Sequence, residues 1–117
     1  MKETKLYLAF LNSLKGLTRS FHEERAVRQE ILLLMAGIPI SAIIASNFLF
    51  FILLVGSLLF VLAVELLNTG IEKLCDHVTP GHHITIGYIK DLGSAAVLCA
   101  LSLAILVWGY AFYVFLS

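Results

Sequence analysis

The sequence predicts an all-α integral membrane protein, a three-helix bundle preceded by an amphipathic helix. Of its 117 residues, 60% are hydrophobic and only 14% are charged, which is not the composition of a soluble protein. All Lys, Arg, Asp and Glu residues lie within 2–30 and 65–91, so 31–64 and 92–117 carry none. Uncharged apolar segments of this length are typical of membrane-spanning helices, which need about 20 apolar residues. We therefore expect residues 1–117 to form a single membrane domain.

The first predicted element is an amphipathic helix over residues 3–25. Its apolar residues recur every three or four positions, at Leu6, Phe10, Leu14, Leu17 and Phe21. Such a pattern is typical of a helix that lies in the membrane interface instead of crossing the bilayer. On this helix Glu24 lies at the edge of the apolar face, whereas Glu23 lies on the polar side. We expect Glu24 to face protein and Glu23 to face water.

Three membrane spans are predicted, at about 29–46, 48–70 and 92–114. The first uncharged segment is too long for one helix, because its 34 residues would extend about 50 Å across a hydrocarbon core of about 30 Å. Ser46 and Asn47 are the most polar pair inside it, so the chain is expected to turn there.

A cytoplasmic loop is predicted between the last two spans, over residues 71–91. Thr79-Pro80-Gly81 is a turn signature, and Asp91 suits the N-cap of the last helix. Six of the eight Lys and Arg residues precede residue 30, and the other two, Lys73 and Lys90, flank this loop. The positive-inside rule then places the N-terminus and the loop in the cytoplasm and the C-terminus outside.

A polar stripe marks the predicted second span and its continuation. Glu65, Asn68, Glu72 and Asp76 fall on one helical face, within an arc of about 80°. A charge inside an apolar span is costly and usually marks function. Carboxylate and amide oxygens suit Mg²⁺, but the stripe could also relay protons or supply a general base. For Asp76, interfacial solvation and a hydrogen bond between helices explain the residue equally well.

A second constellation is Lys90-Asp91, at the start of the last span. Lysine can meet phosphates as a point charge, although a Lys–Asp pair at this position is also a common membrane-boundary marker. The chain has no glycine-rich phosphate motif, so a nucleotide would be held by acidic residues through a metal and by Lys90. The net charge is zero and there is no basic patch, so nucleic acid is not an expected partner.

Self-association is expected from the last span. Ala96, Ala100 and Ala104 form a series of small residues, four positions apart, that lets helices pack closely. Three helices alone also bury little polar surface.

Several segments resemble one known family. They are Lys15-Gly16-Leu17, Glu24-Arg25-Ala26-Val27-Arg28-Gln29-Glu30, Val64-Glu65-Leu66-Leu67-Asn68-Thr69-Gly70-Ile71-Glu72, Asp76, and Lys90-Asp91-Leu92-Gly93-Ser94-Ala95-Ala96-Val97. Together they resemble the prokaryotic diacylglycerol kinases, membrane enzymes that phosphorylate lipid hydroxyls with MgATP. The resemblance covers nearly the whole chain. Ala26-Val27-Arg28-Gln29-Glu30 looks like the diacylglycerol branch of the family, not the undecaprenol branch.

The resemblance implies a role for each site residue. Glu65 would be the general base that takes the proton from the lipid hydroxyl, and Glu24 and Glu72 would hold Mg²⁺. The implied nucleotide-binding residues are Lys5, Asn12, Glu24, Asn68, Glu72, His83, Lys90 and Asp91. The implied lipid-binding residues are Ala9, Ser13, Glu30, Glu65, Ser94 and Trp108. The family also implies a homotrimer with active sites shared between subunits, in the inner membrane of a bacterium.

Some positions of the first helix depart from the family pattern. Lys5, Asn12 and Leu14 stand where better-known members have Arg, Tyr and Trp. Lysine in place of arginine loses bidentate contact with phosphate, which affects the nucleotide contacts implied for this helix. The acidic stripe and the Lys–Asp pair are not affected.

The leading hypothesis is an ATP-dependent kinase that converts diacylglycerol to phosphatidic acid at the cytoplasmic membrane face. Undecaprenol phosphorylation is the alternative within the same class. A small oligomeric proton-coupled transporter is the alternative from another class, because it too could use one membrane glutamate. A transporter would need Glu65 but would gain little from Lys90 and Asp91.

Overall fold

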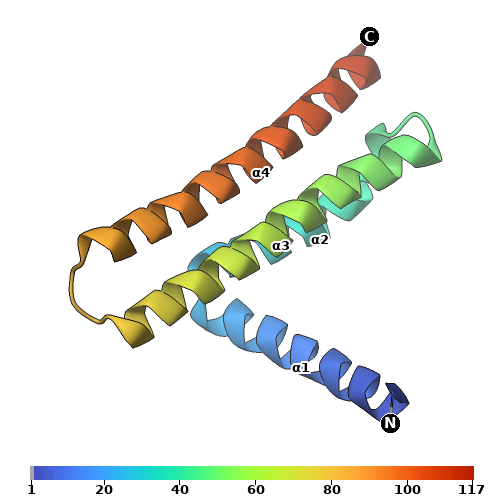
Figure 1. Cartoon of the computed structure of the whole chain (residues 1–117). Helices are drawn as coiled ribbons and strands as arrows, with labels where there is room; N and C mark the ends of the chain where they lie inside the picture. Colours follow the sequence, from blue (N-terminus) through green and yellow to red (C-terminus); the bar gives the residue numbers. More distant parts are fainter. Residues whose placement is uncertain (1) are drawn as a thin grey trace.

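The computed structural model describes residues 2–117, with side chains from residue 4 onward, and every regular element in that part of the chain is an α-helix. The helices are α1 (Lys2–Glu23), α2 (Arg25–Ile44), α3 (Phe48–Val78) and α4 (Ile84–Leu116) (Figure 1). Three of them, α2, α3 and α4, are long and apolar enough to cross a membrane. The all-α class predicted from the sequence is confirmed.

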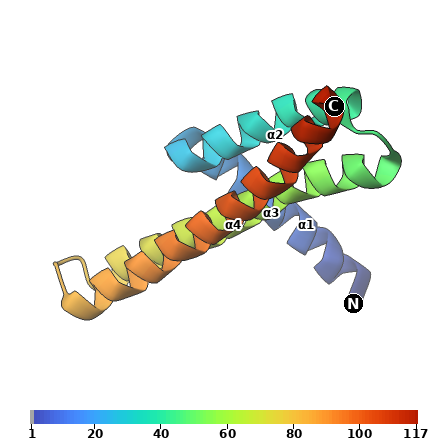
Figure 2. The ribbon, with the colours of Figure 1, turned by 90° about the horizontal axis from the view of Figure 1, so that it is seen from above.

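Helix α3 is the centre of the bundle. It packs against both α2 and α4, whereas α2 and α4 meet each other at few positions (Figures 1 and 2). One buried cluster joins Val61 of α3 to Ala100 and Ala104 of α4. Because alanines let backbones approach closely, these two small residues serve packing inside one chain. The self-association predicted from them therefore needs other support.

The connection between α2 and α3 is a tight turn. Helix α2 ends at Ile44, and α3 begins after Asn47, whose side-chain oxygen accepts a hydrogen bond from the backbone N–H of Phe50 at 2.9 Å. Asparagine is a favoured N-cap because it satisfies one of the free N–H groups of the first turn. The turn predicted at Ser46 and Asn47 is confirmed.

The connection between α3 and α4 is shorter than the predicted loop. Helix α3 continues to Val78 and α4 begins at Ile84, so only residues 79–83 are non-helical. The N-cap of α4 is His83, whose Nδ1 accepts a hydrogen bond from the N–H of Thr85 at 3.1 Å; the N-cap predicted at Asp91 is wrong, since that residue lies inside α4. Hydropathy marks where a helix leaves the apolar layer, and α3, which contains no proline, continues through Gly70 to the Thr79-Pro80-Gly81 turn.

Helix α1 leaves the bundle at a kink (Figures 1 and 2). Glu24 is the single non-helical residue between α1 and α2, with φ −113° and ψ 114°. Its N–H donates to the carbonyl of Ser20 at 2.8 Å, and its own carbonyl accepts from the N–H of Arg28 at 3.0 Å. The side chain of Arg28 also donates to the carbonyl of Phe21 at 3.1 Å, which satisfies the C-terminal end of α1. Hydrogen bonding is therefore continuous through the junction.

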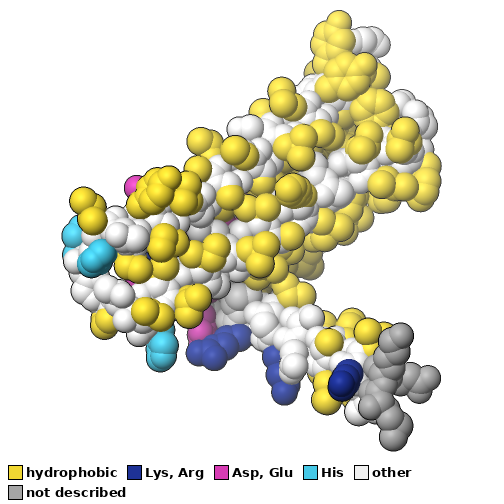
Figure 3. Space-filling model, in the orientation of Figure 1, with side chains coloured by type: hydrophobic (Ala, Val, Ile, Leu, Met, Phe, Trp, Pro, Cys, Tyr) yellow, Lys and Arg dark blue, Asp and Glu magenta, His cyan; other side chains and the backbone are white. Residues whose placement is uncertain are grey.

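The outer surface of the bundle is strongly apolar, and charged side chains gather on α1 and at the end that carries the α3–α4 connection (Figure 3). Large hydrophobic side chains such as Ile43, Leu67 and Leu106 are exposed. An apolar surface of this extent suits lipid or further protein, as expected of a membrane protein.

Candidate functional site

The acidic stripe follows one face of α3 from the interior to the exposed end. Glu65 and Asn68 are buried, with 9% and 7% of their surface exposed, Glu72 is half-buried and Asp76 is exposed. Burying a carboxylate is costly unless it is paired or used. Glu65 is the most buried carboxylate of the stripe, so its charge is the most costly to keep in place.

Asn68 is the best-packed polar side chain of the stripe. Its Nδ2 donates to Oε1 of Glu72 at 3.2 Å. Its Oδ1, by contrast, is buried without a hydrogen-bond partner in the described part of the chain. Because buried polar atoms are nearly always hydrogen-bonded, this unsatisfied oxygen distinguishes Asn68 from the other polar side chains of α3.

Gly93 of α4 packs directly against the amide of Asn68. A Cβ atom at this glycine would overlap Oδ1 of Asn68. Glycine is therefore required here for the close approach of α4 to α3, and this approach brings the start of α4 alongside the stripe. In the sequence Gly93 stands out only as part of a motif. Its packing role could not be predicted, because the side chain that opposes it lies 25 positions earlier in the chain.

Lys90 joins α4 to the exposed end of the stripe. Its Nζ donates to Oδ1 of Asp76 at 2.7 Å, so the predicted lysine of the nucleotide site and the last residue of the stripe form one ion pair. Lys90 lies outside the predicted spans, and the hydrogen bond that it donates to Asp76 raises its pKa. The neighbouring Asp91 is exposed on α4.

Glu24 turns from the kink towards α3, where it meets Lys73. The Nζ of Lys73 lies 2.7 Å from Oε1 of Glu24, and the carboxylate side chain is 23% exposed. Glu23 is exposed and pairs with Arg19 of the same helix at 3.1 Å. The expectation that Glu24 faces protein and Glu23 faces water is confirmed. Lys73 was not among the predicted site residues, although it directly follows Glu72.

The two lysines are linked electrostatically to the stripe. The hydrogen bond to Glu24 raises the pKa of Lys73, which also lies beyond the predicted span 48–70. Both ammonium groups therefore stay charged at neutral pH and offset part of the negative charge of the neighbouring carboxylates.

The oxygen donors suit an ion that is shared with substrate. In the part of the chain that the structure describes, no three His, Cys, Asp or Glu side chains converge on a complete metal cage. Magnesium, however, is usually held by one or two carboxylates together with waters and substrate phosphates. Glu24 and Glu72 are partly exposed carboxylates, which are the ligands that such an incomplete protein site uses.

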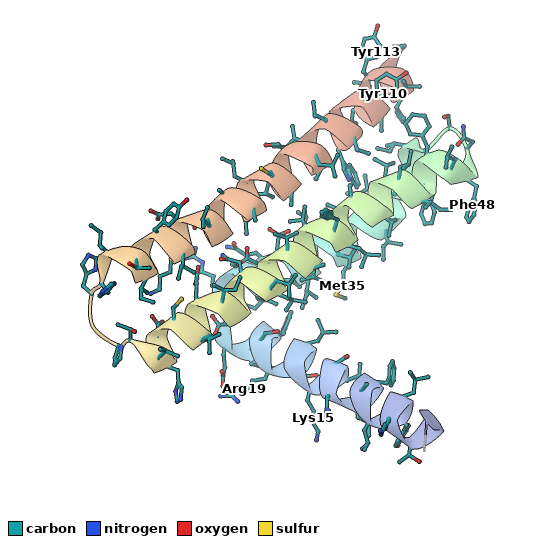
Figure 4. The ribbon with its side chains drawn as sticks, in the orientation of Figure 1. Lys15, Arg19, Met35, Phe48, Tyr110 and Tyr113 are labelled. Carbon is teal, nitrogen blue, oxygen red and sulfur yellow. The ribbon has the colours of Figure 1, made fainter. Side chains whose placement is uncertain are left out.

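One predicted residue of α1, Ser13, lines a groove together with Leu66, Thr69 and Gly70 of α3. The N-terminal half of α1 diverges from the bundle, and the labelled side chain of Lys15 points away from α3 (Figures 1 and 4). Arg19 lines a groove with Thr69 and Lys73 of α3. The predicted nucleotide and lipid residues of this helix are all exposed: Lys5, Ala9, Asn12 and Ser13. His83 is also exposed, at the α3–α4 connection.

Two of the predicted lipid-binding residues share an apolar groove between α2, α3 and α4. Glu30 and Trp108 both line it, and its volume is about 240 Å³. The indole N–H of Trp108 is engaged inside the chain, where it donates to the carbonyl of Leu54 and to the hydroxyl of Ser57, each at 3.2 Å. Ser94 is exposed on α4, one residue after Gly93.

Fold and site together define a class: a small all-α membrane protein whose carboxylate-rich polar stripe begins inside a membrane helix and ends beside a lysine of the next. Comparison with known proteins identifies the family. The model of the prokaryotic diacylglycerol kinase family matches residues 11–112.

Relatives in three bacteria cover most of the chain. The diacylglycerol kinase of Haemophilus influenzae is 38% identical over 97 residues, which are 83% of this chain and 82% of the relative. That of Escherichia coli K12 is 34% identical over 105 residues, 90% of this chain and 86% of the relative. That of Pseudomonas aeruginosa is 35% identical over 96 residues, 82% and 78% respectively.

The chain therefore belongs to the prokaryotic diacylglycerol kinase family, as the resemblance of its motifs predicted. Family membership and the three helices long enough to cross a membrane together indicate an inner-membrane protein.

Proposed function

We propose that this protein transfers the γ-phosphoryl group of MgATP to the hydroxyl of diacylglycerol, producing phosphatidic acid and ADP at the cytoplasmic face of the inner membrane. The observation that carries the proposal is the buried Glu65, with Asn68 and Glu72 on the same helical face, in a chain of this family. A lipid hydroxyl at the edge of the apolar layer and a nucleotide in water can meet along such a stripe.

Glu65 is the proposed general base. In the transfer, the lipid oxygen forms a bond to the γ-phosphorus, the bond from that phosphorus to the ADP oxygen breaks, and the hydroxyl proton moves to the carboxylate of Glu65. A carboxylate near the membrane boundary is within reach of a lipid head group, and general-base catalysis requires this reach before anything else. Removing such a base typically costs about 10²- to 10⁴-fold in rate.

The residues beyond Glu65 position the nucleotide. Glu24 and Glu72 would hold Mg²⁺, which neutralises the charge on the β- and γ-phosphates when it is bound. Phosphoryl transfer depends mainly on positioning and charge stabilisation, so a small set of oxygen and ammonium groups is sufficient. The ammonium of Lys90, which now donates to Asp76, would donate to a phosphate of the nucleotide instead. Asn68 would hold Glu72 through its amide N–H. Asp91 and His83 are the remaining proposed contacts from this end of the bundle.

We further propose that the site is completed between copies of the chain, in a homotrimer. The exposure of Lys5, Ala9, Asn12 and Ser13 on a helix that diverges from the bundle supports this proposal, because nucleotide and lipid residues are useful only when they face a site. The second copy would bring its own stripe to this helix. The N-terminus and residues 79–83 would then lie in the cytoplasm, and the C-terminus outside.

The test is transfer of labelled phosphate from MgATP to diacylglycerol and to undecaprenol in mixed micelles. Glu65→Gln and Glu72→Ala should abolish labelled phosphatidic acid, whereas Glu23→Gln, which removes an exposed carboxylate beside Glu24, should retain it. Size-exclusion chromatography in detergent checks that each variant keeps the oligomer of the parent. Label on undecaprenol alone would move the protein to the other branch of the family. No labelled lipid from a folded oligomer would sink the kinase and favour the transporter.

A further inference from the structure

One ion pair fixes the carboxylate of Glu24 before any ligand is present. The ammonium of Lys73 lies 2.7 Å from Oε1 of this residue. The pair joins the α1–α2 kink to α3, and these two segments are otherwise far apart in the sequence. It is distinct from the Lys90–Asp76 pair, which joins α3 to α4.

The backbone at the kink leaves the Glu24 side chain free for this contact. Glu24 occupies the N-cap position of α2, yet its carboxylate makes no capping hydrogen bond. Its backbone N–H and carbonyl are already bonded to Ser20 and Arg28. The direction of the carboxylate is therefore set by a rigid kink on one side and by Lys73 on the other.

An ammonium and a metal ion compete for the same oxygen. Oε1 of Glu24 lies 2.7 Å from the ammonium of Lys73, so a divalent cation bound to this carboxylate would lie close to a positive charge, and the two cations would repel each other. Lys73 also follows directly after Glu72, the other proposed ligand, in the sequence. Binding of a divalent cation by Glu24 therefore requires the ammonium of Lys73 to move away.

We infer that Lys73 is the internal counter-ion of Glu24: it is a positioning residue that holds this carboxylate towards α3 and is displaced when a divalent cation binds. The inference rests on the proposed metal role of Glu24. It predicts that Lys73 weakens the binding of a divalent cation, although it also holds the carboxylate of Glu24 in position. The exposed lysine limits the size of the effect, because solvent-exposed ion pairs are weak. We expect a change of about threefold in the dissociation constant.

The test measures binding of Mn²⁺ alone to the detergent-solubilised full chain, from the electron paramagnetic resonance signal of the free ion. Lys73→Met, which keeps the length of the side chain without its charge, should bind Mn²⁺ about threefold more tightly than the parent. Lys73→Arg should stay at or above the dissociation constant of the parent, since it restores the counter-ion. Lys15→Met is the matched control, because it removes one positive charge from an exposed position of α1 and should leave Mn²⁺ binding unchanged.

Kinetics supply a second readout that a merely structural lysine would not give. In the phosphorylation assay, Lys73→Met should lower the KM for Mg²⁺ without raising kcat. Unchanged or weaker Mn²⁺ binding in Lys73→Met, with the oligomer intact, would overturn the inference. Lys73→Gln is measured beside it, so that a folding defect of one variant does not decide the result.

Glu24→Gln separates this inference from the proposed function. Loss of Mn²⁺ binding in Glu24→Gln supports the ligand role on which the inference rests, and unchanged binding overturns both. A parent that phosphorylates diacylglycerol, together with Lys73 variants that bind Mn²⁺ like the parent, would refute the counter-ion alone. A parent that makes no labelled phosphatidic acid would refute the kinase, whatever Lys73 does to Mn²⁺.

Discussion

The two ends of the α3–α4 pair are built differently. The outer end is the one that carries the α2–α3 turn. There Phe50 stacks on Tyr110 with ring centroids 5.9 Å apart, and both hydrogen-bond acceptors of the Trp108 indole lie in α3. Phe48, Tyr110 and Tyr113 gather at this end (Figure 4). At the other end, the buried Oδ1 of Asn68 has no hydrogen-bond partner among the residues that the structure describes. We interpret the outer end as the part that holds the two helices together and the polar end as the part that serves a substrate.

The two ends also differ in what a substitution should change. At the polar end, a change should reduce catalysis more than stability, because partnerless or exposed groups contribute little to folding. At the outer end, a change should reduce stability first. Four substitutions test this contrast, from the largest expected effect to the smallest.

Glu65→Gln should have the largest effect. The amide keeps the shape of the side chain but cannot take a proton, so kcat should fall by about 10³-fold. The thermal midpoint of the oligomer should not fall, because glutamine removes a buried charge. Radiometric phosphorylation of diacylglycerol, with differential scanning fluorimetry in detergent, measures both quantities. A variant with more than a tenth of the parent rate would remove Glu65 from the role of base.

Gly93→Ala should come next. The added methyl group overlaps Oδ1 of Asn68, so the amide must turn and lose its hydrogen bond to Glu72. Displacement of a positioned group by about 1 Å can cost about a hundredfold in rate. Gly109→Ala is the matched control on the same helix, because a Cβ there meets open space. Equal activity in the two variants would contradict the packing role of Gly93.

Lys90→Met should have a smaller and more selective effect. Loss of one phosphate-binding ammonium should raise the KM for ATP by about tenfold, as expected for a charge-assisted hydrogen bond. The KM for diacylglycerol should stay near that of the parent. Steady-state kinetics with each substrate varied in turn makes the distinction. A rise in the lipid KM alone would place Lys90 outside the nucleotide site.

Ser57→Ala should affect stability only, and slightly. It removes one of the two acceptors of the Trp108 indole, at a cost of about 1 kcal/mol or less in the free energy of unfolding. The rate of phosphorylation should stay within about twofold of the parent, because the outer end carries no reacting group. Denaturant titration in mixed micelles and the radiometric assay measure the two effects. A large loss of rate without loss of stability would reverse the proposed division of the molecule.

Much of this contrast follows from local sequence patterns. The helices, the turn at Asn47 and the orientations of Glu23 and Glu24 follow from periodicity and polarity, which act over a few residues. The ends of α3 and α4 near residues 78 and 84 do not follow from hydropathy, because a helix continues past the edge of the apolar layer until a breaker such as Pro80 stops it.

Contacts between distant residues could not be predicted in this way. Gly93 against Asn68, Lys73 with Glu24, and Trp108 with Leu54 each join positions that no single helix relates. Only the rotation of each helix about its axis and the distance between helices determine such pairs. The catalytic roles came from the family resemblance, because many proteins with different functions can carry an acidic stripe.

The kink at Glu24 limits the insertions and deletions that the chain can accept at this point. Because α1 and α2 are joined by one extended residue with continuous hydrogen bonds, there is no slack between them. One residue inserted or deleted here would turn α1 by about 100° relative to α2. Its apolar face would then point in a different direction relative to the bundle. The number of residues at this junction therefore sets the rotation of α1 relative to α2, and it matters more than their identity.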